Sequence, residues 1–168
     1  RGDQVIEITL AFGVAEVRVR DEAPQSEAAA LDQAWVDAIE AKDWPTANQL
    51  RDQAVSQWQG VAGELARLRG TTAMFAERQF ESCDSWAEAE RPRVDHPAIR
   101  ALLLEQQNHC IGYANAGGWK RGLVLLDEAS AILERSAPES LLKARIDALR
   151  AQILSFSDPA KGKSLVEA

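Results

Sequence analysis

Apolar and polar residues alternate at the start of the chain. The alternation covers residues 5–10 and 15–20, on either side of a turn that contains Gly13. A period of two on both sides of a glycine turn predicts a β-hairpin. A two-stranded hairpin is only marginally stable alone in water. We therefore expect residues 1–22 to be a β-hairpin appendage. It would pack on the rest of the chain, pair with a second copy through residues 4–20, or complete a sheet in a longer protein.

From Pro24 onward, apolar residues recur at alternating intervals of three and four, the period of an α-helix. Six helices with short connections are predicted, several of them apolar on two faces. Their apolar stripes cover residues 31–39, 47–68, 73–87, 99–113, 119–133 and 142–156. The pattern thus predicts a mainly α domain over residues 23–156, followed by a polar tail over residues 157–168.

Proline and glycine mark the expected helix ends. The second helix is expected to end near Gly70, and the third to begin at Thr71 or Thr72. Residues 91–97 contain two prolines and are expected to form a loop. Gly117 and Gly118 are expected to end the fourth helix.

Two segments share a further pattern. Residues 41–47 and 116–122 each combine a helix end, a tight turn, an aromatic residue and a small residue three positions later. Seven positions beyond those small residues come Ala54 and Ala129. Over residues 28–62 and 103–136 this spacing resembles the tetratricopeptide repeat, in which two helices meet at small side chains. The resemblance implies antiparallel helical hairpins stacked as a short α-solenoid, and an antiparallel helical bundle is the alternative.

Tetratricopeptide arrays bind a peptide or a partner helix in a concave groove that the first helix of each hairpin lines. Carried over position by position, the resemblance implies a groove lined by Asp32, Val36, Ile39 and Glu40 from the first unit and by Leu104, Gln107, Ile111, Ala114 and Asn115 from the second. A mixed apolar and acidic lining favours an amphipathic or basic partner segment. The alternative for Val36, Ile39 and Ile111 is that they are core residues.

Charge and cysteine content narrow the classes of partner and location. The net charge is -7 and basic residues are interleaved with acidic ones, so nucleic acid is a poor partner. No apolar run reaches the roughly 20 residues that cross a bilayer, so we expect no membrane insertion. Cys83 and Cys110 form no close-spaced motif, and we expect them to be reduced thiols of a cytoplasmic protein.

Residues capable of chemistry are few and scattered. His109 and Cys110 are adjacent, so on a helix they point about 100° apart and do not share a metal ion. Cys83 and His96 add no paired ligand spacing. Residues 159–164 end like a phosphate-binding loop but lack its first glycine. We therefore expect no catalytic, cofactor or metal site.

These patterns together predict a protein–protein interaction module, an adaptor or regulatory domain of a larger protein of bacterial type. Two alternatives stay open. One is a helical accessory domain of an enzyme. The other is an assembly subunit that pairs through its N-terminal hairpin.

Overall fold

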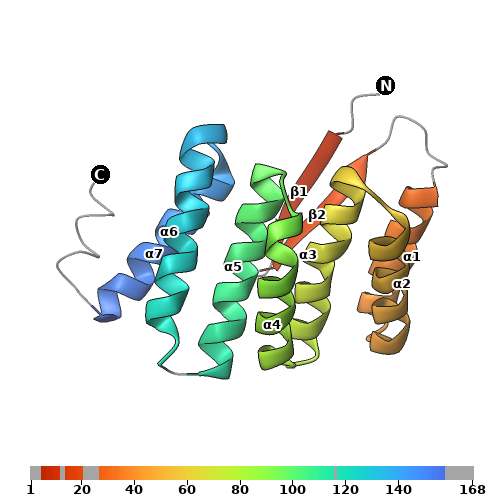
Figure 1. Ribbon diagram of the computed structural model, residues 1–168, viewed down its shortest axis with the longest axis horizontal. Coiled ribbons are helices and arrows are strands. Elements are labelled where there is room, and N and C mark those ends of the chain that lie inside the picture. Colours follow the sequence, from red (N-terminus) through yellow and green to blue (C-terminus); the bar gives the residue numbers. More distant parts are fainter. Residues whose placement is uncertain (1–4, 12–13, 21–26, 116, 158–168) are drawn as a thin grey trace.

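The computed structural model describes residues 5–11, 14–20, 27–115 and 117–157 (Figure 1). Within these ranges, side chains are described from residue 30 onward, except for that of Asp32. Near the N-terminus, β1 (Val5–Ala11) and β2 (Val14–Arg20) are antiparallel neighbours, with Ile8 opposite Val17. The helices are α1 (Glu27–Glu40), α2 (Trp44–Gln57), α3 (Gly60–Ala76), α4 (Phe80–Glu90), α5 (Pro97–Ala114), α6 (Trp119–Ser136) and α7 (Leu141–Ser157), with the short 3-10 helix η1 (Arg91–Arg93) before α5. The prediction of a mainly helical fold is confirmed.

The helices stand side by side in a row, and consecutive helices run in opposite directions (Figure 1). Each helix packs against its neighbours in sequence, and α3 also packs against α5. The connections α1–α2, α3–α4 and α5–α6 all lie at one end of the row, together with the last turn of α7. We call this end, which is at the bottom of Figure 1, the lower end.

The prediction of one helix over the apolar stripe of residues 47–68 is wrong, because the structure has two helices there, α2 and α3. The chain is extended at Trp58, with φ and ψ of -109° and 142°, and Gly60 begins α3 with a φ of +63°. A left-handed φ suits glycine, which has no Cβ to clash with the backbone. The apolar spacing between Ala47 and Leu68 continues across this break, so periodicity alone did not show it.

The predicted helix end at Gly70 is also wrong, because α3 continues to Ala76. Gly70 is buried against the indole of Trp86 on α4, and a Cβ at Gly70 would lie 2.5 Å from Cε2 of that ring. The indole Nε1–H donates a hydrogen bond of 2.9 Å to the carbonyl of Arg67. The glycine therefore makes room for a neighbouring helix rather than ending its own.

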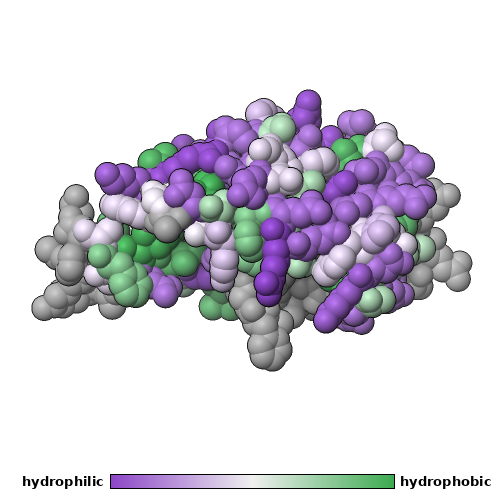
Figure 2. Space-filling model, turned by 90° about the horizontal axis from the view of Figure 1, so that it is seen from below, coloured by the Kyte–Doolittle hydropathy of each residue, from purple (hydrophilic) through white to green (hydrophobic). Residues whose placement is uncertain are grey.

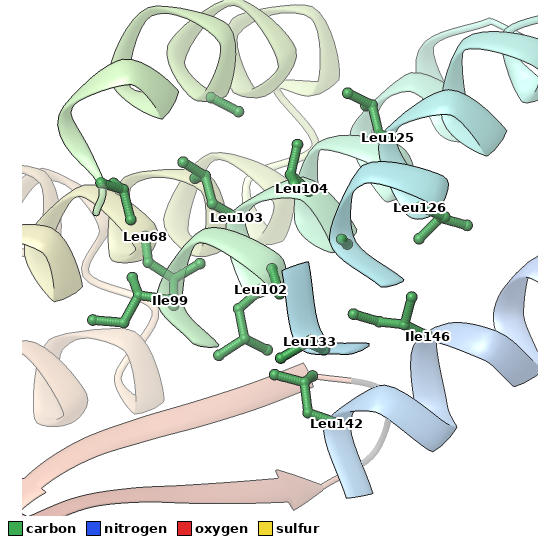
Figure 3. Close-up of a cluster of buried hydrophobic side chains, with 14 of the residues drawn as sticks. Leu68, Ile99, Leu102, Leu103, Leu104, Leu125, Leu126, Leu133, Leu142 and Ile146 are labelled. Carbon is green, nitrogen blue, oxygen red and sulfur yellow. The ribbon is translucent and has the colours of Figure 1, made fainter. Parts of the chain in front are cut away.

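One apolar core extends across α3 to α7, with α5 at its centre (Figure 3). The helix α5 is buried on all sides over most of its length, because α3, α4 and α6 pack around it. The largest fully buried apolar side chains of this core are Leu65, Ile99, Leu102, Leu103, Leu104, Leu126, Leu133 and Ile146. A smaller cluster around Trp35 joins α1 and α2 to α3.

Cys83 and Cys110 form a disulfide between α4 and α5, so the expectation of reduced thiols is wrong. Their Cα atoms are 6.0 Å apart, and both side chains are fully buried. The two residues are 27 positions apart in sequence, and only the antiparallel packing of α4 on α5 brings them together. Among the helices described, none combines the length and apolarity that a membrane crossing requires.

Candidate protein-binding surface

Aromatic side chains from several helices meet at the lower end. Phe75 of α3, Phe80 of α4 and Tyr113 of α5 form a cluster with ring centroids 5.1–5.5 Å apart. Phe80 and Tyr113 are stacked, and Phe75 presents its edge to Tyr113. Such offset and edge-on pairs each contribute about 0.5–1.5 kcal/mol beyond simple burial. Tyr113 is nevertheless 67% exposed, so the cluster is open to solvent.

Two hollows lie on either side of Tyr113. One, of about 450 Å³, is formed by the α3–α4 turn and is lined by Phe75, Ala76, Arg78, Phe80 and Tyr113. The other, of about 400 Å³, lies between α5, α6 and α7. Its apolar and aromatic lining consists mainly of Tyr113, Trp119, Leu149, Ile153 and Phe156. Figure 2, which views the lower end, shows apolar side chains gathered toward the α7 side of the row.

We define the aromatic surface as Phe75, Phe80, Tyr113, Trp119 and Phe156. Phe156 is 84% exposed and Trp119 is 38% exposed. Exposed aromatic residues gathered at one place are typical of binding surfaces, since a large exposed apolar patch is costly unless a partner covers it. Among the described residues, none covers the exposed parts of Tyr113, Trp119 and Phe156.

The lining of the two hollows contains basic but no acidic side chains. Neither hollow is lined by Asp or Glu, whereas Arg78 lines one and His109 the other. The ammonium of Lys120 lies 5.4 Å from the ring centroid of Trp119. Arg78 and Lys120 form no ion pair with any residue whose side chain the structure describes, while Glu77 and Glu81 flank the α3–α4 turn.

A polar network holds α4, α5 and α6 together beside this surface. The amide of Gln107 donates hydrogen bonds of 2.9 Å to both Asp84 and Glu88 on α4. Arg121 of α6 binds the same two carboxylates, at 2.6 Å and 3.2 Å. The bond from Gln107, helped by Arg91 and Arg121, lowers the pKa of Glu88, and the bond to Asp84 raises the pKa of Arg121. The carboxylates of Asp84 and Glu88 are thus paired within the protein, with Arg121 and Gln107.

His109 also lines the second hollow. Its ring centroid lies 6.2 Å from that of Phe75, and its Nε2 is 3.8 Å from a carboxylate oxygen of Glu105. Glu105 is 1% exposed and is bound by Arg145 of α7 at 2.6 Å. Glu105 and Arg145 form an ion pair that joins α5 to α7, so this arrangement favours a structural role over acid–base catalysis.

The groove residues expected from the sequence do not form one open surface. Leu104, Gln107 and Ile111 are buried within the helix packing, because α5 lies in the middle of the row. They are unavailable to a partner in this structure. Glu40 and Asn115 are exposed, and Ala114 is half-buried.

The other expected groove residues lie on α1, at the far side of α3 from α5 (Figure 1). Val36 and Ile39 are half-buried and pack against the cluster around Trp35, which agrees with the alternative that they are core residues. The side chain of Asp32 lies outside the described part of the structure. The groove residues expected on α1 and those expected on and just after α5 therefore lie apart and do not form one groove.

The residues of the aromatic surface were missed as a site. Phe80, Tyr113, Trp119 and Phe156 belong to apolar stripes, and the spacing alone predicted that such stripes would be buried. One signal could have found them. Each lies within about one turn of a helix end, and those ends meet at the lower end.

Within the described residues, no group of three or more His, Cys, Asp or Glu side chains could hold a metal ion. Comparisons with protein-family models, with curated proteins and with solved structures found no significant match to this chain.

Proposed function

We propose that this chain is a protein-binding module of stacked helical hairpins, and that it binds a partner segment at its aromatic surface. The observation that carries the proposal is the open cluster of Phe75, Phe80 and Tyr113 between two apolar hollows. Binding energy at protein interfaces is concentrated in a few residues, most often Trp, Tyr and Arg. The aromatic surface and Arg78 supply these residue types together.

The helix junctions support a tetratricopeptide-like array of three hairpins. The second helix of each hairpin begins with an aromatic residue, namely Trp44, Phe80 or Trp119, and each is followed three positions later by a buried small residue, namely Ala47, Cys83 or Gly122. Small residues there allow close helix packing. In this proposal α7 closes the array.

Two of the turns are also alike in backbone geometry. Lys42 and Arg78 have left-handed φ angles of 57° and 62°. In both turns, the N–H of this residue donates to the carbonyl three positions back, and the next N–H donates five positions back. This is the bonding of a Schellman motif, here without glycine. The middle hairpin, α3–α4, thus repeats the geometry of the first.

The partner that fits best is a helical or extended segment with bulky apolar side chains and at least one carboxylate. Two hollows separated by Tyr113 suit two apolar anchors. Arg78 in one hollow and Lys120 beside the other favour acidic groups, since the hollows themselves contain no acid. This replaces the amphipathic or basic partner expected from the acidic groove.

The disulfide bears on where such binding takes place. Disulfides form and persist in oxidising compartments and are rare in the cytosol. A buried disulfide between two central helices therefore argues against the expected cytoplasmic location. We propose that the protein works in an oxidising compartment.

A library of displayed helical peptides tests the proposed function. Each peptide would carry randomised apolar residues at i, i+4 and i+7. Selected peptides would be compared by fluorescence anisotropy in Glu-rich and Lys-rich versions. We expect Tyr113→Ala and Phe80→Ala to weaken binding at least about tenfold. The Glu-rich version should bind more tightly than the Lys-rich version, and Arg78→Glu should reverse that preference.

Leu141→Ala is the matched control. Leu141 is an exposed apolar residue, 81% accessible, at the opposite end of α7 from the aromatic surface. The Leu141→Ala variant should bind the peptides with the affinity of the parent protein. If no selected peptide depends on Tyr113 or Phe80, or if Leu141→Ala weakens binding equally, the proposed function is wrong.

A further inference from the structure

The Cys83–Cys110 disulfide lies directly behind the aromatic surface. On α4, Phe80 precedes Cys83 by three residues, and on α5, Tyr113 follows Cys110 by three residues. Residues three apart share one face of a helix. The disulfide and the Phe80–Tyr113 stack are therefore successive layers of one contact between α4 and α5. The stacked rings are 5.1 Å apart, and the Cα atoms of the two cysteines are 6.0 Å apart.

A covalent bond between these layers fixes the separation of the two helices. Bonded sulfurs are about 2 Å apart, whereas non-bonded heavy atoms pack at roughly 3.5–4.0 Å. Both cysteine side chains are fully buried, and helix interfaces are close-packed, so two separate thiols need more room there than the bonded pair. Breaking the bond must therefore move α4 against α5 or rotate the cysteine side chains, and a movement of the helices also displaces the stacked rings one turn away.

We infer that the disulfide positions the aromatic surface, so that the oxidised chain binds its partner more tightly than the reduced chain. This inference rests on the proposed function and adds its regulation. Newly made chains would carry two thiols and an incomplete surface. Oxidation would join α4 to α5 and bring Phe80 against Tyr113.

The redox step is a thiol–disulfide exchange with a disulfide-bearing oxidant. The two thiols lose two electrons and two protons, one S–S bond forms in this chain, and one S–S bond in the oxidant is reduced to two thiols. The reverse step needs a dithiol reductant and passes through a mixed disulfide. Because both sulfurs are buried, either step in the folded chain requires α4 and α5 to open, so the formed bond persists.

The position of Tyr113 can be followed without any partner. Tyr113 is the only tyrosine of the chain, so a protein labelled with 3-fluorotyrosine gives one ¹⁹F resonance. We expect reduction with dithiothreitol to shift this resonance toward that of Phe80→Ala, because the ring currents of the stack weaken. The Cys83→Ala/Cys110→Ala variant should show the shifted resonance and should not respond to dithiothreitol. An unchanged resonance in protein whose two thiols have been titrated would overturn the inference.

Binding of a selected Glu-rich peptide tests the consequence. We expect Kd to rise at least about tenfold on reduction and in the double cysteine variant, with helix content unchanged by circular dichroism. Leu142→Ala is the control for a general loss of stability, since Leu142 is buried at the upper end of α7 and the disulfide stays intact. It should keep the oxidised affinity.

The possible failures are distinguishable. Equal affinity of the oxidised and reduced proteins overturns the redox inference and leaves the proposed function standing. Failure of the oxidised protein to bind any selected peptide overturns both, because the inference rests on that binding.

Discussion

Gly70 offers a sharp test of how α3 and α4 pack. In an exposed helix interior, replacing glycine by alanine stabilises a protein by about 1 kcal/mol. At Gly70 the added methyl would overlap the indole ring of Trp86, with Cε2 at 2.5 Å. Overpacking of this kind costs about 1–3 kcal/mol. Displacing the indole also removes its hydrogen bond to the Arg67 carbonyl, which is worth about 0.5–1.5 kcal/mol. We therefore expect Gly70→Ala to destabilise the protein by about 0.5–3.5 kcal/mol net.

Gly112 provides the matched control on α5. It is exposed, and a Cβ there would meet no atom within 4 Å. Gly112→Ala should therefore stabilise the protein by up to about 1 kcal/mol. Urea unfolding followed by circular dichroism measures both variants, and the two changes should have opposite signs.

A second variant tests the cause. In a Trp86→Ala background the steric overlap is gone, so Gly70→Ala should become neutral or stabilising. If Gly70→Ala is as stable as the parent protein while Trp86 is present, the packing described for α3 and α4 is wrong. The same conclusion follows if the cost of Gly70→Ala persists without Trp86.

Three further predictions concern stability. Cys83→Ala/Cys110→Ala should lower the free energy of unfolding by about 3–4 kcal/mol, because the disulfide closes a loop between residues 27 positions apart. Urea unfolding measures this change, and an unchanged midpoint would contradict a native disulfide. Gly122→Val should destabilise by at least about 1 kcal/mol, because a Cβ there would overlap the side-chain oxygen of buried Asn108, and calorimetry would show a lower Tm. Burial raises the pKa of Asp147, but bonds from Lys143, Ser130 and Arg150 outweigh it and leave that pKa lowered. The ionised carboxylate therefore stabilises the fold fully above the unfolded pKa of 3.8, and this stability is lost as the pH falls below 3.8 and through the lower folded-state pKa. Asp147→Asn should therefore flatten the loss of stability on acidification, and a parallel pH profile would refute this.

Apolar spacing predicted the helical class and most of the core, because a stripe at intervals of three and four can be buried only by a neighbouring helix. Leu102, Leu126 and Ile146 belong to such stripes and are fully buried. The spacing did not show where one helix gives way to the next. At Trp58 the stripe continues in phase through an extended residue, and at Gly70 a glycine serves the partner helix instead of a turn.

The candidate surface was less accessible to sequence reasoning for a related reason. A stripe shows which face of a helix is apolar but not whether another helix covers it. Phe80 and Tyr113 lie in stripes like those of the core, yet the row of helices leaves them at an open end. The disulfide was missed because no local spacing encodes a contact between residues 27 positions apart.

The bond from Arg145 to Glu105 has a consequence for any attempt to shorten this protein. The last helix, α7, lies at one end of the row, but its Arg145 supplies the guanidinium that pairs with the buried carboxylate of Glu105 on α5. Cutting the chain before Leu141 would leave that carboxylate without its cation, and an unpaired charge at such depth is strongly destabilising. A minimal binding fragment should therefore retain the final helix or replace Glu105 with an uncharged residue.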